Sequence, residues 1–158
     1  MSLDYSTTIQ EYVEIIYDLQ KKHKVARVKD IAEVRGVTLS SVTAALNLLK
    51  EKKLVEHEHY GLIVLTKKGE KLAKQLLRSH TTIKNFLVDV LGVSEKTAEI
   101  DACVLEHHIS STSLNSLIDF LNFIDNCPKG EPVWLQNYKK TKETGRLPET
   151  CVQCRGRA

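Results

Sequence analysis

Apolar residues recur every three or four positions through most of the chain, which is the spacing of helices that bury one face. This spacing is clear over residues 9–22, 28–35, 42–50, 66–91 and 114–126. Residues 54–58 and 62–66 are shorter apolar segments around a glycine-containing turn, and they predict a two-stranded hairpin. The pattern therefore predicts a mainly α fold with one small sheet.

Residues 28–50 have the spacing of a helix-turn-helix. A short amphipathic helix ends at Gly36, and a second helix begins after Thr38. The outward positions of the second helix are short and uncharged, as a helix that enters a DNA major groove requires. With the hairpin after it, this unit predicts a winged helix-turn-helix, although other small helical domains also contain two helices joined by a turn. The candidate DNA-binding residues are Arg27, Thr38, Leu39, Ser40, Ser41, Thr43, Ala44 and Asn47, with His59 and Tyr60 in the wing.

Three side chains that bind metals follow one another at helical spacing near the middle of the chain. Cys103, Glu106 and His107 stand at i, i+3 and i+4, so a helix would present all three on one face. A thiol, a carboxylate and an imidazole suit a borderline first-row metal ion better than calcium or magnesium. A half-buried helix with a solvated polar edge would show the same spacing.

A pair of carboxylates on the first predicted helix is a second candidate for metal binding. Glu11 and Glu14 stand at i, i+3 near the start of that helix. Carboxylates there often only complement the helix dipole. The alternative is that the pair completes a metal site whose other donors come from elsewhere in the chain.

The predicted helix over 66–91 is longer than a winged helix-turn-helix needs, so we expect it to connect two domains, with Thr66 as its N-cap. The predicted domains are a DNA-binding domain over residues 4–72 and an all-α metal-binding and dimerisation domain over residues 73–126. The last helix of the second domain is more apolar than a small domain needs, which indicates a dimer face.

A basic tail with three cysteines is predicted over residues 127–158. Cys151 and Cys154 form a Cys-x-x-Cys pair, and Cys127 lies some distance upstream. These three thiols could hold a zinc ion or an iron site with a fourth ligand that the sequence does not identify. The alternative is a solvated basic tail without a metal.

Composition and charge agree with a polyanion-binding protein. The chain has 158 residues, of which 42% are hydrophobic, and a net charge of +3. The excess of Lys and Arg lies in residues 1–79 and in the tail, whereas residues 80–126 are acidic. No apolar segment has the length of a membrane span and no signal-peptide pattern is present, so we expect a cytoplasmic protein whose cysteines are thiols or metal ligands.

Several motifs occur together in one order, and with them the chain resembles the diphtheria-toxin-repressor family of metal-dependent regulators over roughly residues 7–126. The motifs are Glu11-Tyr12-Val13-Glu14, Asp30-Ile31-Ala32, Ser40-Ser41-Val42-Thr43, Leu65-Thr66-x-x-Gly69, His80 and Leu105-Glu106-His107. The resemblance implies a homodimer that binds a palindromic operator in double-stranded DNA, with Fe(II) or Mn(II) joining the DNA-binding and dimerisation domains. It implies as metal ligands Glu11, Glu14, His80, Cys103, Glu106 and His107.

The chain departs from the family pattern at three places. Lys84 stands where family members usually have a carboxylate of a second metal site. Cys103 resembles the iron-responsive branch of the family, whereas the length of the chain resembles the manganese-responsive branch. The wing has Tyr60-Gly61 where an Arg-Gly pair is common.

The sequence therefore predicts a metal-dependent transcriptional repressor of metal-homeostasis genes rather than an enzyme. An alternative is a winged-helix regulator that responds to redox state through its cysteines. A metalloenzyme is a weaker alternative, because the sequence has no glycine-rich phosphate loop, no His-Glu-x-x-His motif and no nucleophile–base pair.

Overall fold

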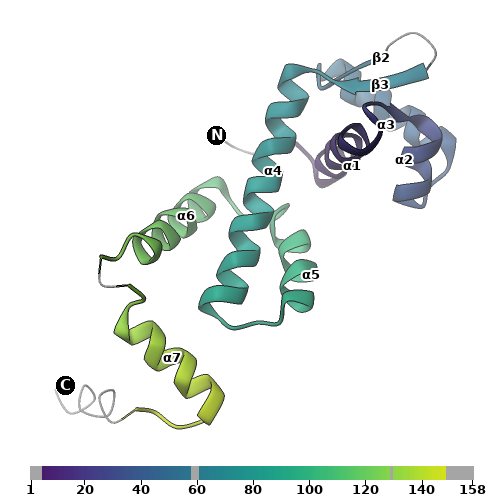
Figure 1. Cartoon of the computed structure of the whole chain (residues 1–158). Helices are drawn as coiled ribbons and strands as arrows, with labels where there is room; N and C mark the ends of the chain where they lie inside the picture. Colours follow the sequence, from purple (N-terminus) through teal and green to yellow (C-terminus); the bar gives the residue numbers. More distant parts are fainter. Residues whose placement is uncertain (1–4, 58–60, 129, 149–158) are drawn as a thin grey trace. The chain divides into compact units, whose positions relative to one another are not determined.

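The computed structural model describes residues 5–57, 61–128 and 130–148 (Figure 1). The chain divides into two compact units, with the boundary between Ser79 and His80. This boundary lies seven residues beyond the end of the DNA-binding domain expected from the sequence, within one long helix. The helical character of both units confirms the predicted mainly α fold.

The first unit begins with three helices, α1 (Thr7–His23), α2 (Val28–Arg35) and α3 (Leu39–Glu51). Ser6 is the N-cap of α1. Gly36 ends α2 at φ 69°, a left-handed conformation that glycine adopts without a steric cost, and its N–H bonds to carbonyl oxygens of the last turn. The predicted helix–glycine turn–helix is therefore present.

The first unit also has a three-stranded antiparallel sheet, one strand of which precedes the helix-turn-helix while the other two follow it. Its strands are β1 (Ala26–Arg27), β2 (Val55–His57) and β3 (Leu62–Leu65), in the order β1-β3-β2. In the register, Ala26 lies opposite Ile63, and Val55 lies opposite Leu65. The structure thus has the predicted hairpin and adds β1, whose two residues are too few to show a periodic pattern.

The core of the first unit lies between α1, α2, α3, the sheet and the first half of α4 (Lys67–Asn85). Val13, Ile16, Leu49 and Ile63 are completely buried in it. Thr66 caps α4 as predicted, since its hydroxyl accepts a hydrogen bond from the N–H of Gly69 at 3.1 Å. This core holds α3 and α1 in one rigid unit.

Helix α4 continues directly into the π-helical segment η2 (Phe86–Val90), so the predicted helix over 66–91 is present but changes its winding near the end. In the second unit three further helices follow, α5 (Glu95–Leu105), α6 (Ser111–Asp125) and α7 (Val133–Thr144). Ser94 caps α5 and accepts a hydrogen bond from the Thr97 N–H. Ser110 caps α6 and accepts a hydrogen bond from the Ser113 N–H.

The buried hydrophobic residues of the second unit are few compared with those of the first. They are Ile83, Val90, Ala98, Ala102 and Leu135. Helix α6 has no fully buried residue, and Phe123 on it is 68% exposed. The other apolar residues predicted for this face, Leu114, Leu117, Ile118, Leu121 and Ile124, are partly buried within one chain.

Candidate metal centre and DNA interface

Helix α3 has the division between apolar and polar faces that a recognition helix needs. Val42, Leu46 and Leu49 are buried, as predicted, and Ala45 packs against the same core. The residues expected to contact DNA are all exposed, namely Thr38, Leu39, Ser40, Ser41, Thr43, Ala44 and Asn47. The core thus fixes α3 while its short polar side chains face outward.

The first turn of α3 is ordered by its own hydroxyl groups. The Thr38 hydroxyl accepts a hydrogen bond from the Ser41 N–H at 3.3 Å and lies 2.9 Å from the hydroxyls of Ser40 and Ser41. Thr43 donates its hydroxyl to the Leu39 carbonyl oxygen. Small hydroxyl side chains at a helix N-terminus allow close approach of a phosphate group or a base edge.

One further predicted DNA contact lies in the sheet. Arg27 is exposed on β1, next to the helix-turn-helix. His59 and Tyr60, expected at the tip of the wing, lie outside the described residues.

In the first unit, the carboxylates of α1 have different surroundings. Arg35 of α2 donates a hydrogen bond to the Glu11 carboxylate and forms an ion pair with it. Glu14 is half-buried, and burial, followed by the charges of Asp18 and Glu11, raises its pKa to about 7. Glu11 is thus neutralised by a cation, whereas Glu14 is held close to its protonated form.

In the second unit, three of the predicted ligands lie together. The side chains of Glu106 and His107 are only 3% and 5% exposed, and His107 Nε2 lies 4.0 Å from Glu106 Oε1. His80 of α4 places its Nδ1 atom 3.3 Å from the same oxygen of Glu106. A buried carboxylate with an imidazole on either side is therefore present in this unit.

The backbone around Glu106 differs from the sequence expectation. Helix α5 ends at Leu105, and Glu106 is its C-cap, with φ −58° and ψ −30°. The N–H groups of His108 and Ile109 both bond to the Leu105 carbonyl oxygen, which starts a turn. Cys103, Glu106 and His107 therefore do not share one continuous helix, and Cys103 is exposed on α5.

Two charged residues that were not expected as part of the cluster extend it on the second nitrogen of His80. Glu99 of α5 places Oε1 3.1 Å from His80 Nε2, and Lys84 Nζ lies 2.7 Å from Glu99 Oε2. The hydrogen bond from Lys84 lowers the pKa of Glu99, and the same bond raises the pKa of Lys84. Glu99 lies one helical turn before Cys103, a spacing that the sequence already shows.

The donors of the second unit fit a divalent first-row metal ion by their chemistry. Glu106 offers a carboxylate and His107 and His80 offer imidazoles, a mixture that suits manganese, iron or zinc. Burial of Glu106 and His107 excludes most water from their side chains, which strengthens the attraction of a carboxylate for a cation. Cys103 and the α1 carboxylates Glu11 and Glu14 stay predicted ligands.

The predicted tail site is only partly described. Cys127 follows α6 and is partly exposed. Cys151 and Cys154 lie outside the described residues, so a zinc or iron site at these thiols stays a prediction.

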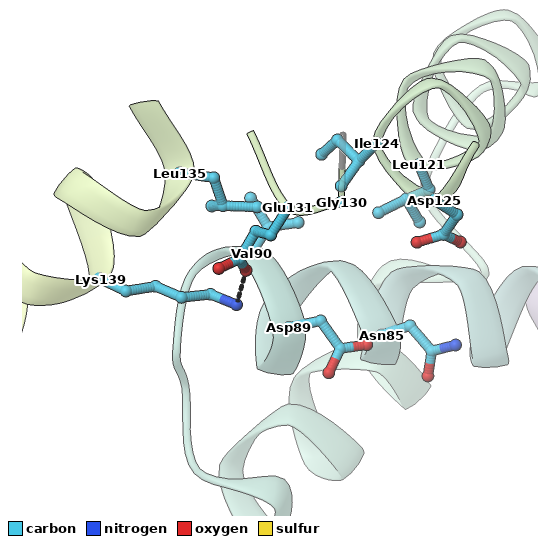
Figure 2. A pocket seen from close by; sticks show the side chains of 10 residues that line it. All are labelled: Asn85, Asp89, Val90, Leu121, Ile124, Asp125, Gly130, Glu131, Leu135 and Lys139. Atoms are coloured by element: carbon cyan, nitrogen blue, oxygen red, sulfur yellow. Dashed lines mark hydrogen bonds and ion pairs between the residues drawn. The ribbon is translucent and has the colours of Figure 1, made fainter. Parts of the chain in front are cut away.

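A separate pocket of about 300 Å³ lies in the second unit, lined from α4, η2, α6, α7 and the loop before α7 (Figure 2). Asp89 and Asp125 contribute carboxylates to its wall, and Lys139 forms an ion pair with Glu131. None of the predicted metal ligands lines it, so this pocket is distinct from the candidate metal centre. Among the described residues, none of the helices combines the length and apolar character of a membrane span.

Two family models match consecutive parts of the chain. Residues 4–62 match the N-terminal DNA-binding domain of iron-dependent repressors. Residues 66–135 match the metal-binding and dimerisation domain of the same proteins.

Relatives with similar sequences are transcriptional regulators and not enzymes, in agreement with the prediction. The HTH-type transcriptional regulator MntR of Bacillus velezensis is 33% identical over 138 residues, which cover 87% of this chain and 96% of the relative. An uncharacterized HTH-type transcriptional regulator of Methanocaldococcus jannaschii is 38% identical over 117 residues, which cover 73% of this chain and 94% of the relative.

Solved structures of metal-responsive regulators are also similar. The manganese regulator SloR is 33% identical with a TM-score of 0.63, over 76% of this chain and 56% of that one. This chain therefore spans less than two thirds of the length of that protein. Together with the two matched domains, these likenesses show that the chain belongs to the diphtheria-toxin-repressor family of metal-dependent transcriptional regulators.

Proposed function

We propose that this chain is a homodimeric repressor that requires Mn(II) or Fe(II) to bind a palindromic operator and that controls metal-homeostasis genes. The observation that supports this most is the buried Glu106–His107 pair beside His80, in a chain whose α3 also has the exposed polar face of a recognition helix. The membership of the chain in a family of metal-dependent regulators supports it further.

The proposed ligands come from both units. Glu106, His107, His80 and Cys103 belong to the second unit, and Glu11 and Glu14 belong to the first. These residues would hold a divalent ion, which would supply a positive charge to offset their carboxylates. Because α1 and α3 are parts of one core, fixing α1 also fixes the position of the recognition helix. The predicted consequence is that the two recognition helices of a dimer match successive major grooves.

The side chains around the proposed ligands have defined tasks. In the metal-free protein, His80 holds the Glu106 carboxylate in place through its Nδ1 atom. Arg35 neutralises Glu11 until the ion pair between them opens. Glu14 would release its proton on becoming a ligand, since its raised pKa keeps part of the population protonated near neutral pH.

Two features bear on the choice of metal. The solved structures with similar sequences include a manganese regulator, which favours Mn(II). The thiol of Cys103 is a softer donor than a carboxylate and favours Fe(II). The proposal therefore includes both ions, and DNA binding measured with each of them shows which one is the stronger activator.

The proposal is tested with Glu106→Gln, which keeps the shape of the side chain and removes its charge. Fluorescence anisotropy under anaerobic conditions measures binding to the DNA upstream of the protein's own gene, with chelator, Mn(II) or Fe(II). The wild type is expected to bind about 5–150-fold more tightly with the effective metal than with chelator, the usual range of allosteric coupling. Glu106→Gln is expected to lose this gain.

The matched control is Asp101→Asn, which neutralises an exposed carboxylate on α5, the helix that Glu106 caps. It should retain the full response to metal. A Glu106→Gln variant that is folded and whose DNA binding still responds to metal like that of the wild type would show that Glu106 is not a metal ligand.

A further inference from the structure

The ammonium group of Lys84 is the positive charge in a cluster of the second unit that also contains Glu99, His80 and Glu106. Its ammonium group is 2.7 Å from Glu99 Oε2, and the other oxygen of Glu99 is 3.1 Å from His80 Nε2. His80 in turn places Nδ1 3.3 Å from Glu106 Oε1. The cluster is therefore a row in which basic side chains alternate with carboxylates, from Lys84 through Glu99 and His80 to the buried Glu106.

The two nitrogens of His80 face different carboxylates. A neutral imidazole donates from one nitrogen and offers a lone pair on the other. Nδ1 lies 3.3 Å from Oε1 of the buried Glu106 and Nε2 lies 3.1 Å from Oε1 of Glu99, which is 55% exposed, so the neutral ring can donate to only one of the two carboxylates, and the tautomer that donates to Glu106 has its Nε2 lone pair toward Glu99. An imidazole lone pair and a carboxylate oxygen on adjacent helices are donors that a second metal ion would use.

That position already has a positive charge. The Lys84 ammonium donates to Glu99 and neutralises it, and a divalent ion held by Glu99 and His80 would lie close to this ammonium. Like charges at such a distance repel each other, and a protonated lysine has no lone pair with which to bind the metal ion and offset this repulsion. A carboxylate at position 84, one turn after His80 on α4, would instead attract the metal ion and would offer it an oxygen ligand.

We infer that Lys84 acts as a built-in substitute for a second metal ion, so that each protomer binds a single ion. The inference rests on the proposed metal-dependent function, because it concerns the number of ions in the same cluster. Lys84 is thus a residue that determines the stoichiometry of the site, and it acts through Glu99 rather than as a ligand.

The number of ions is measured on the full chain with Mn(II) alone. Mass spectrometry of the metal after removal of unbound ions gives the ratio of manganese to protomer, and electron paramagnetic resonance separates isolated Mn(II) ions from spin-coupled pairs. The wild type is expected to contain one Mn(II) per protomer with the spectrum of an isolated ion. Lys84→Glu is expected to contain two, with the spectrum of a coupled pair.

Two control variants separate the role of Lys84 from a general effect of charge. Lys84→Arg keeps the cation and should still bind one Mn(II). Lys96→Glu makes the same change of charge at an exposed position of α5 and should also bind one.

The possible failures are distinguishable. Two Mn(II) per wild-type protomer would overturn the inference and leave the proposed function intact. A single ion in a folded Lys84→Glu variant would also overturn it, since Lys84 would then not be what excludes the second ion. A wild type that binds no Mn(II) and no Fe(II) would contradict the proposed function itself.

Discussion

At the scale of single residues, the ion pair between Arg35 and Glu11 competes with metal binding. The guanidinium occupies the carboxylate that the sequence predicts as a ligand. Both side chains are about one third exposed, so the pair contributes roughly 0.2–1 kcal/mol. Metal binding to Glu11 has to overcome this contribution.

Replacing Arg35 by glutamine should therefore raise the affinity for Mn(II), by up to about fivefold, which corresponds to about 1 kcal/mol. Competition with a fluorescent chelator measures the affinity. The gain should disappear in a Glu11→Gln background, because the two residues act through one interaction. An equal gain in both backgrounds would show that Glu11 is not a ligand.

The raised pKa of Glu14 gives the metal-free protein a defined pH dependence. The pKa is about 7 in the folded chain and 4.5 for an ordinary glutamate. A group with a raised pKa binds a proton more tightly when folded, so its contribution to stability is complete below pH 4.5 and is lost as the pH rises through 7.

We therefore expect Glu14→Gln to raise the melting temperature of the metal-free protein at pH 8, where the wild type carries a buried charge. At pH 5 the difference should shrink, since the folded wild type is then protonated at this position. Thermal unfolding in the presence of chelator measures both values. The same difference in melting temperature at pH 5 and pH 8 would contradict a raised pKa of Glu14.

At the scale of elements, the start of α4 depends on the absence of a side chain at Gly69. A Cβ atom at this position would lie 2.1 Å from the backbone oxygen of Leu54, which belongs to the segment before β2. Backbone atoms in a packed core have little freedom to move away, so the helix and this segment can approach so closely only with glycine.

Gly69→Ala is expected to destabilise the protein by about 1–3 kcal/mol, the usual cost of overpacking, although alanine is the better helix former. Urea denaturation followed by circular dichroism measures the free energy of unfolding. Lys71→Ala, an exposed change in the same helix, should have little effect. A Gly69→Ala protein as stable as the wild type would refute this packing argument.

Elements with a long periodic pattern and clear end signals could be predicted from the sequence. Helix α3 is an example, because Thr38 caps its start and its apolar residues recur at helical spacing. The end of α5 could not be predicted, since Glu106 keeps helical dihedral angles and only the hydrogen bonds after it reveal the turn. Strand β1 could not be predicted because it forms only by pairing with β3, which is distant in the sequence. The π-helical winding of η2 could not be predicted because helix propensities do not encode it.

The candidate site was predictable to a similar extent. Spacing and resemblance led to Glu106, His107 and His80, which the second unit brings together. They did not reveal that Lys84 binds Glu99 or that Arg35 binds Glu11, because ion pairs between helices depend on tertiary packing. These missed contacts are the ones that set the charge around the predicted ligands.

At the scale of the whole molecule, the incompletely buried apolar face of α6 supports a homodimer. No residue of this helix is fully buried within one chain, and Phe123 is 68% exposed. Phe123→Asp should weaken dimerisation by at least about tenfold, because burial of a phenylalanine side chain contributes roughly 1.5–3 kcal/mol. Sedimentation equilibrium measures the dissociation constant of the dimer.

The neighbouring change Asn122→Asp adds the same charge at an exposed polar position and should leave the dimer intact. If Phe123→Asp and Asn122→Asp dimerise as tightly as the wild type, the α6 face around Phe123 is not the interface.

We expect metal binding and DNA binding to be coupled in this chain. The most direct test is the DNA affinity of the wild type, measured by anaerobic fluorescence anisotropy on its own upstream DNA as Mn(II) or Fe(II) is titrated from a chelated start. We predict binding that appears only as the metal site fills and that weakens steeply with added salt, as contacts to phosphates require. Equally tight binding under chelator would contradict the claim and would leave a winged-helix protein whose metal, if bound, does not control DNA binding.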